Sequence, residues 1–196
     1  MDVELPLASG AGHWIWLGGR PALDLVNTRR ERWRRDIDTL VLPSDLGDWL
    51  EAAGFDLAGA STDGGALDAA RRLRDSIDAA LDAVLEARRP PRDALATIDA
   101  WIPSAQVTPH LVQRGKAAVL AEPRPRDPVA HALGVVALDA ARMLGTDERE
   151  RVRICASATC GVRFYDRSPA GRRRWCSMER CGNVAKARRH RRRGSS

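Results

Sequence analysis

The sequence has no apolar run long enough to cross a membrane. The longest run, "ALGVVAL" at 132–138, is followed directly by Asp139, whereas a spanning helix needs about 20 apolar residues. The opening "MDVELPLASG" is acidic where a secretory signal would be basic and then apolar. We therefore expect a cytoplasmic protein that does not associate with a membrane.

Catalytic signatures are also missing. The sequence has no His-Glu-x-x-His motif, no Gly-x-Ser-x-Gly elbow and no phosphate-binding loop, and its four histidines are scattered. Residues distant in sequence can still meet in a fold, so an enzyme with its site in residues 1–147 is kept as the least favoured alternative. A deep pocket with convergent polar groups there would support it. We expect that the protein is not an enzyme.

Cysteine is absent from the first 154 residues, and aromatic residues make up only 5% of the chain. What is present is typical of a globular protein, with 44% hydrophobic and 30% charged residues. A length of 196 residues suggests one domain, or a medium domain with a small appendage.

Charge divides the chain into two unequal parts. From Arg151 onward, 14 Lys and Arg residues face two carboxylates, a net charge of +12, whereas residues 1–150 carry 24 carboxylates and 18 cations, a net charge of −6. The change falls within "TDERERVR" at 146–153. We predict an acidic domain over residues 1–147 and a basic module over residues 148–196.

Hydrophobic periodicity predicts that the first domain is mainly helical. The strongest pattern lies in 62–91, where apolar residues recur on a single helix face up to Pro90-Pro91. Further helices are expected within 20–35, 42–55, 92–103 and 127–145, and residues 110–122 are typical of a β hairpin turning at Arg114-Gly115. The expected fold class is mainly α with a small β hairpin (α+β).

Local signals refine these elements. Ser44 is the expected N-cap of the helix in 42–55, and Asp127 caps the last helix with Pro128 at its first position. Leu95 is expected to face inward, and "HWIWL" at 13–17 to form a short strand.

The four cysteines, Cys155, Cys160, Cys176 and Cys181, follow the pattern Cys-x4-Cys, fifteen residues, Cys-x4-Cys. Two such pairs in a reducing compartment are typical of a structural zinc site, because Zn²⁺ prefers four soft ligands at tetrahedral corners. Two disulfides or an iron–sulfur cluster are the alternatives. Four thiolates leave no open position for water, so we expect one structural Zn²⁺ rather than a catalytic ion.

The residues between the cysteine pairs resemble a hairpin. "VRFYD" is predicted as one strand with Val162 and Phe164 on one face, "RSPAG" as a turn, and "RRRW" at 172–175 as the returning strand. A helix is expected to follow from Ser177. These elements predict a small treble-clef-like zinc finger with four cysteine ligands at the C-terminus.

The last helix is exceptionally basic. Helix stability alone would be harmed by the repulsion within "RRHRRR", so an anionic partner explains the pattern better. Nucleic acid, DNA above RNA, is the predicted partner. A solubility tail, an acidic protein partner and an RNA- or ribosome-associated role are the alternatives. The predicted contact residues are Arg172, Arg173, Arg174, Lys186, Arg188, Arg189, Arg191, Arg192 and Arg193.

Two segments carry a family resemblance. "C-x4-C-G-x-x-F-x-D-R-S" followed by "R-x-W-C-S-M-x-x-C-G-N-x-A-K-A-R-R" resembles the CGNR zinc finger, with Val184 where the arginine of that motif stands. "LGGRPALDLVNT" with "LPSDLGDWLEAAG" is similar to the ABATE domain that usually precedes this finger.

The resemblance implies a stress-responsive transcription regulator whose first domain is a sensor or an oligomerisation unit. It implies a small-molecule effector as a candidate partner. A homodimer is a further candidate, because a single finger offers few base contacts. Asp24 and Asn27, polar groups in an apolar stretch, are the candidate ligand-binding residues, although such groups more often brace buried backbone. "TRRERWRR" at 28–35 is a candidate second phosphate-contacting surface, or a solvated helix face.

Overall fold

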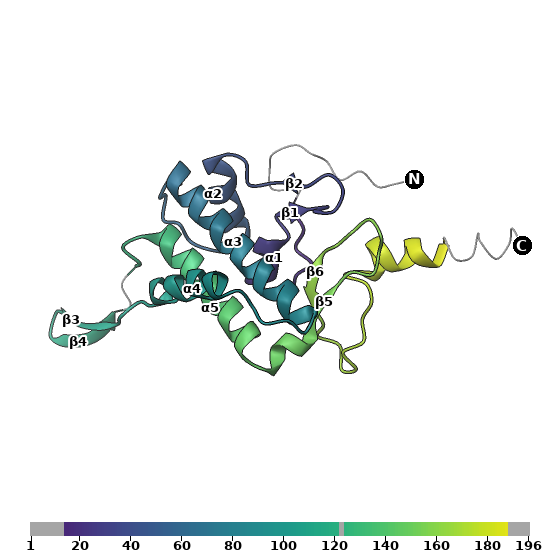
Figure 1. Cartoon of the computed structure of the whole chain (residues 1–196). Helices are drawn as coiled ribbons and strands as arrows, with labels where there is room; N and C mark the ends of the chain where they lie inside the picture. The colour runs from purple at the N-terminus through teal and green to yellow at the C-terminus, as the bar shows by residue number, and fades with distance from the viewer. Residues whose placement is uncertain (1–13, 122–123, 188–196) are drawn as a thin grey trace, which may run out of the picture.

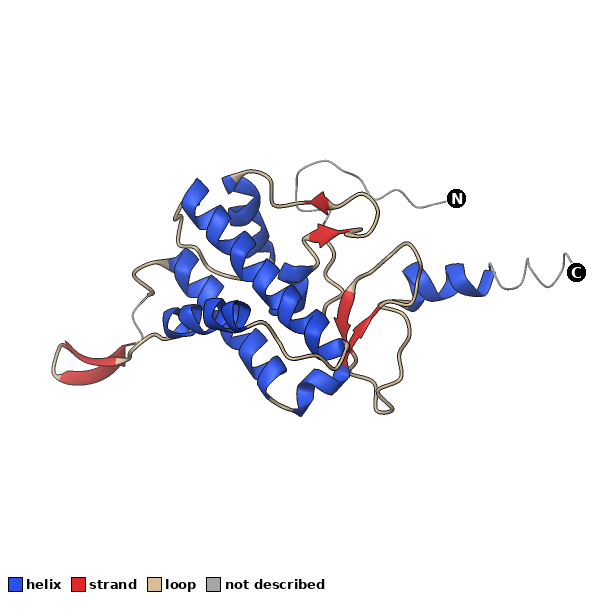
Figure 2. Cartoon of the chain, viewed as in Figure 1, coloured by secondary structure: helices blue, strands red, loops and turns tan. Residues whose placement is uncertain are grey.

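The computed structural model describes residues 14–121 and 124–187. Helices are its main secondary structure, and the described part also has three two-stranded antiparallel sheets (Figures 1 and 2). The α-helices are α1 (Pro21–Val26), α2 (Pro43–Ala52), α3 (Gly64–Leu85), α4 (Arg92–Trp101) and α5 (Pro128–Gly145). The strand pairs are β1 (Arg29–Arg30) with β2 (Ile37–Asp38), β3 (His110–Arg114) with β4 (Ala117–Ala121), and β5 (Val152–Ile154) with β6 (Arg163–Tyr165). The mainly α prediction is confirmed. None of the helices in the described ranges combines the length and apolar character needed to span a bilayer.

The main hydrophobic core lies between α1, α2, α3 and α5. Trp49 of α2, Leu73 and Ile77 of α3, and Leu133 and Val136 of α5 are all buried in it. Each comes from the apolar stripe of its helix, as the periodicity predicted.

Both long helices begin at a capping aspartate, of which the sequence predicted Asp127. The Asp127 carboxylate accepts a hydrogen bond from the Ala130 backbone N–H at 2.9 Å, with Pro128 in the first helical turn. In α3 the Asp63 carboxylate does the same for Ala66 at 2.7 Å. Both satisfy a backbone donor that the helix itself leaves free.

The prediction of one helix over 20–35 is wrong. Helix α1 ends at Val26, and the chain then forms the β1–β2 turn, in which Glu31 and Asp36 adopt a positive φ of 48°. Helix α3 stabilises this turn, because its buried Arg74 donates two hydrogen bonds to the Asp38 carboxylate, at 2.7 and 2.8 Å. "HWIWL" forms no strand over its described residues.

Other local predictions also need correction. The N-cap of α2 is Leu42, and Asp45 rather than Ser44 accepts its backbone N–H at 2.7 Å. Helix α3 ends at Leu85, before Pro90, because Ala87 takes a positive φ of 53°. Leu95 is 42% exposed rather than inward.

The β3–β4 hairpin is confirmed, with Arg114 paired to Ala117 around Gly115, whose φ is +62°. It extends away from the helices, at the opposite end of the molecule from the last helix (Figure 1).

Candidate metal centre and nucleic-acid interface

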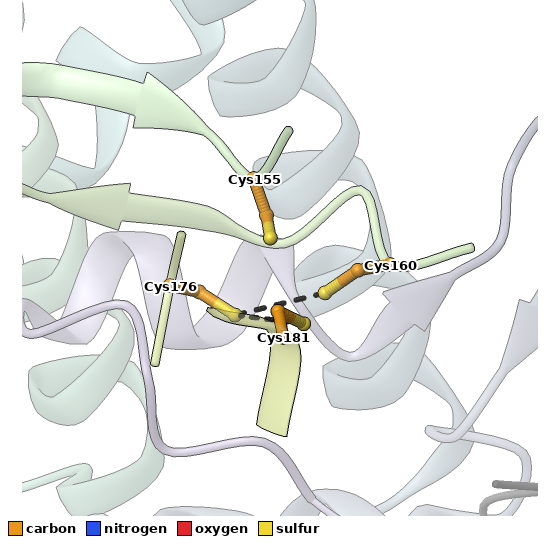
Figure 3. Close-up of side chains that lie close together, drawn as sticks. All are labelled: Cys155, Cys160, Cys176 and Cys181. Atoms are coloured by element: carbon orange, nitrogen blue, oxygen red, sulfur yellow. Dashed lines mark hydrogen bonds between the residues drawn. The ribbon is translucent and has the colours of Figure 1, made fainter. Parts of the chain in front are cut away.

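The four cysteines converge on one point, although they come from two separate segments. Their sulfur atoms all lie within 4.8 Å of one another, and Figure 3 shows the four side chains directed toward a common centre. The Cys160–Cys176 sulfur distance is 3.6 Å and the Cys176–Cys181 distance is 3.8 Å. A tetrahedral zinc ion with Zn–S bonds of about 2.3 Å requires sulfur separations of about 3.8 Å. The residues therefore fit a zinc ion.

The first cysteine pair lies in the loop between β5 and β6. Cys155 directly follows β5, and its backbone N–H donates to the Val162 carbonyl at 2.9 Å, which closes the loop. Backbone N–H groups of Ser157 and Cys176 reach the Cys155 sulfur, and that of Val162 reaches Cys160. Such bonds stabilise thiolates, as zinc ligation requires.

The predicted pairing of the hairpin is wrong at this point. Residues 172–175 form no strand, and β6 pairs instead with β5, which precedes the first cysteine. The side-chain prediction for "VRFYD" holds, since Val162 and Phe164 are both buried beside the cysteines. The hairpin thus encloses the first cysteine pair instead of joining the two pairs.

The second pair spans the start of the last helix, as predicted. Ser177 is its N-cap, with Oγ accepting from the Arg180 N–H at 3.3 Å. The first turn, Met178–Gly182, is a π-helix, and an α-helical stretch follows over 183–187. The wider turn buries Gly182 beside Cys181 and leaves Val184 37% exposed. Val184 is therefore exposed, whereas a regular α-helix from Ser177 would place it on the same side as Cys181.

Gly182 lies close to the Met178 and Trp175 side chains. A Cβ there would lie 2.5 Å from the Met178 sulfur and 3.3 Å from the Trp175 ring. The glycine of the Cys-Gly-Asn segment thus lets the helix approach Trp175 next to the metal ligands.

Cys155, Cys160 and Cys176 influence one another's ionisation. Hydrogen bonds from the Cys160 and Cys176 thiols lower the pKa of Cys155 to about 2, and the Cys155 thiolate in turn raises the pKa of Cys160 to about 12. The hydrogen bonds that Cys176 forms with Cys155 and Cys160 raise the pKa of Cys176. Only a cation between them lets four thiolates coexist, so the donor set matches a dication such as Zn²⁺.

Asp166 organises the loop that carries the second pair, a role that the sequence did not predict. Burial would raise the pKa of this fully buried carboxyl, but backbone N–H groups of Arg173 and Ser168, at 2.8 and 2.9 Å, hold it below its usual value. These bonds join β6 to residues 168–173 across the Pro169-Ala170 turn. The signal available in the sequence was an Asp-x-Ser pattern before the turn.

The finger packs on the helical part through buried polar groups. The Asn27 amide donates to the Arg163 carbonyl at 2.9 Å and accepts from the Arg163 N–H at 3.0 Å, so both of its polar groups are used within the chain. The Arg163 guanidinium reaches Asp78 and Asp82 of α3, each at 2.9 Å. The Trp33 ring also lies against Gly161, where a Cβ would be only 1.9 Å away.

The predicted nucleic-acid contacts are only partly within the described residues. Arg172, Arg173, Arg174 and Lys186 are exposed. Arg173 is also used by the finger itself, because it donates to the Cys176 carbonyl at 2.7 Å and lies 5.1 Å from the Phe164 ring. The other five residues, Arg188, Arg189, Arg191, Arg192 and Arg193, lie outside the described residues.

The candidate surface at 28–35 is largely ion-paired. Arg32 pairs with Asp78 at 2.8 Å, and Arg35 pairs with Glu31 at 2.5 Å. Arg29 pairs with Asp36 at 2.7 Å. This segment is a turn rather than a helix face, and these three arginines are already bound by carboxylates.

Asp24 is half-buried and accepts the Gly18 N–H at 2.8 Å. Burial raises its pKa to about 6, with the Asp139 carboxylate acting in the same direction. Because the folded pKa lies above the usual value of 3.8, the folded state binds more protons between about pH 4 and 6, and this group lowers stability as pH rises through that window.

Replacing Asp24 with Asn should therefore stabilise the protein at neutral pH. The amide oxygen can still accept the Gly18 N–H, and the cost of the buried charge disappears. We expect the Asp24→Asn free energy of unfolding at pH 7 to rise by about 1–3 kcal/mol, and the gain to shrink toward pH 5. Urea titrations of both zinc-saturated proteins measure this. Lower stability of the variant at pH 7 would show that the carboxylate makes a favourable interaction.

The surface hollows in the described part of the chain include ones with volumes of about 610, 580 and 460 Å³. The first lies where the finger meets the helices, and its carboxylates Asp139 and Glu148 both bind Arg20, at 2.7 and 2.6 Å. The second contains His110 and His131, and His131 Nδ1 lies 3.1 Å from the Ser104 carbonyl. The third is mainly apolar and includes Leu95 and Ile98.

A cysteine quartet held by a short hairpin and the start of a helix defines a zinc-finger protein that binds one structural zinc ion. Residues 151–194 match the CGNR zinc finger, and residues 19–147 match ABATE, described as "Putative stress-induced transcription regulator". The ABATE match covers more than half of the chain, so the protein belongs to this family. These two matches confirm the resemblance seen in the sequence, with ABATE first along the chain and the CGNR zinc finger second. A comparison with curated proteins finds no match.

Proposed function

We propose that this protein is a zinc-dependent, DNA-binding transcription regulator that responds to stress. The observation that supports this most is the position of the cations relative to the metal centre. Arg172 and Arg174 lie just before Cys176, and Lys186 follows Cys181 in the same helix. Zinc therefore supports the fold of a segment whose exposed side chains include several cations. Arginine suits phosphate because it binds in a bidentate fork and stays charged.

In this proposal the chain has two working parts. Residues 148–196 bind the nucleic acid, and residues 1–147 form a sensor or oligomerisation unit without enzymatic activity. The charge difference supports the division, because a polyanion repels the acidic first part and attracts the basic second part. The need for reduced thiols supports a cytoplasmic location. RNA is the second candidate ligand, since the same cations contact any phosphate backbone.

A salt-titrated binding assay on the zinc-loaded protein tests the proposal. Deleting residues 188–193 removes five arginines, and the slope of log K against log salt should become shallower by up to about 0.9 for each phosphate that the variant no longer neutralises. Affinity should fall for all duplex sequences. Unchanged binding after the deletion would contradict the assignment of this segment as a contact surface.

Two single substitutions provide a matched control. Arg172→Ala should weaken DNA binding while the thermal unfolding temperature stays unchanged, because Arg172 is exposed. Arg173→Ala should also lower the stability of the finger, since its guanidinium binds the Cys176 carbonyl. Parallel titrations with duplex DNA and with RNA at the same salt concentration distinguish the two ligands. Tighter binding to RNA would favour the RNA-associated alternative.

A further inference from the structure

The β3–β4 hairpin exposes apolar side chains on both of its faces, and neither face is covered by the described part of the chain. Nearly all its residues are exposed or half-buried, and Leu111 and Leu120, which pair directly across the strands, are 72% and 63% exposed. Figures 1 and 2 show the hairpin projecting beyond the helices. An isolated two-stranded hairpin is at best marginally stable in water, so this arrangement requires a further partner.

The two edges of the hairpin differ in charge. Strand β3 carries His110 and Arg114, whereas every residue of β4 is uncharged and apolar, in the order Ala-Ala-Val-Leu-Ala. Soluble proteins commonly protect exposed strand edges with charged residues or proline. Strand β4 has neither, so its edge is the one suited to accept another strand.

We infer that β4 pairs antiparallel with β4 of a second copy of this chain, which makes a four-stranded sheet across a two-fold axis. In the register centred on Val119, Val119 faces its own equivalent and Ala118 faces Leu120 of the second copy. No like charges are opposed. The same pairing through β3, centred on Val112, would set His110 against Arg114 of the second copy and cause repulsion when the histidine is charged.

The pairing also gathers the exposed leucines. Leu111, Ala118 and Leu120 share one face of the hairpin, because side chains alternate along a strand and Leu111 pairs with Leu120. In the four-stranded sheet, the Leu111–Leu120 pairs of the two copies lie diagonally to each other across the two-fold axis, each next to Ala118 of the other copy. Since the hairpin lies at the opposite end from the metal centre (Figure 1), dimerisation leaves the finger accessible.

This inference does not depend on nucleic-acid binding, and sedimentation of the zinc-loaded full chain tests it. The wild type should dimerise, and Leu120→Lys should raise the dimer dissociation constant at least about tenfold by placing a charge on the edge. Leu95→Lys is the matched control, because Leu95 is also exposed but lies in the apolar hollow on α4. A monomeric wild type, or a dimer disrupted by Leu95→Lys instead, would overturn the proposal.

A cross-linking experiment tests the edge directly. Val119→Cys should form a covalent dimer under air in zinc-containing buffer, where the native thiols are held by metal, and Gln113→Cys on β3 should not. Cross-linking of Gln113→Cys without cross-linking of Val119→Cys would place the contact on β3 and contradict the β4 pairing.

Discussion

Cys176→Ser should release zinc and unfold the finger, and this is the largest effect we expect from a single substitution. Cys176 is buried, with its sulfur 3.6 Å from that of Cys160 and 3.8 Å from that of Cys181. Serine substitutes a hard, weakly acidic hydroxyl for a thiolate. Structural zinc sites contribute about 10–16 kcal/mol of apparent folding free energy, so losing one of four ligands removes most of what holds this segment.

The small size of the finger core explains why metal matters so much. Its buried cluster consists of Ile15, Val162, Phe164 and three of the cysteines, so half of its buried members are zinc ligands. A core of this size does not stabilise a fold alone. The helical core, by contrast, contains large apolar residues from five helices and should stay folded.

Elemental analysis and limited trypsin digestion together measure the outcome. The zinc content of Cys176→Ser should fall to near zero, and the exposed arginines at 172–174 should be cleaved rapidly while residues 14–145 remain protected. Thr159→Ala is the control, since Thr159 is exposed in the same loop and is no ligand. Equal zinc in Cys176→Ser and wild type would refute the assignment of Cys176 as a ligand.

The cysteine spacing was enough to predict the metal centre because zinc ligation imposes a local pattern. Two pairs of thiols joined by a turn have few ways to reach one ion, so the sequence specifies the site without knowledge of the rest of the fold. The long helices were predictable for a similar reason. In α3 and α5 a single apolar stripe and a capping aspartate agree.

The errors arose where contacts distant in sequence decide local structure. Residues 28–35 favour a helix by propensity, but Arg74 and Asp78 of α3 bind Asp38 and Arg32 and hold a two-stranded turn. Strand β5 is three residues long and lies in a highly charged segment, so the alternation of Val152 and Ile154 is only a weak strand signal. The exposure of Val184 depends on a π-turn that no hydrophobic period indicates.

The contact between the finger and the helices was the least predictable feature. Asn27 binds the backbone of Arg163, 136 residues further along the chain. The sequence could mark Asn27 as a polar residue in an apolar stretch, but it could not identify the partner. In the structure the Asn27 side-chain amide binds both the N–H and the carbonyl of Arg163, as a neighbouring strand would. These two bonds explain why a polar side chain is buried in the segment after α1.

Arg163→Ala should uncouple the finger from the helical part and destabilise both. Arg163 is buried, with its Nε 2.9 Å from Asp78 and its Nη2 2.9 Å from Asp82, and it also donates to the Gly161 carbonyl at 3.0 Å. Burial already raises the pKa of Asp78, and the Arg163 charge opposes this rise. Removing one partner of a buried ion pair costs about 3–5 kcal/mol, because the remaining charge stays desolvated. Here Arg32 still binds Asp78 at 2.8 Å, so we expect a loss near the lower limit.

Arg153→Ala and Arg163→Lys separate this coupling from the general loss of an arginine. Arg153 lies on the neighbouring strand β5 and binds only backbone carbonyls, of Glu150, Val152 and Gly171. Its removal should therefore cost less and leave the helical part unaffected. Lysine at 163 restores the charge but not the forked geometry, so its stability should be intermediate. Urea unfolding of the zinc-loaded proteins, followed separately in each part by hydrogen exchange, measures all three. If Arg163→Ala costs no more than Arg153→Ala, the ion pair with Asp78 does not join the two parts, and other contacts, among them the Asn27 bonds and the Trp33–Gly161 contact, hold them together.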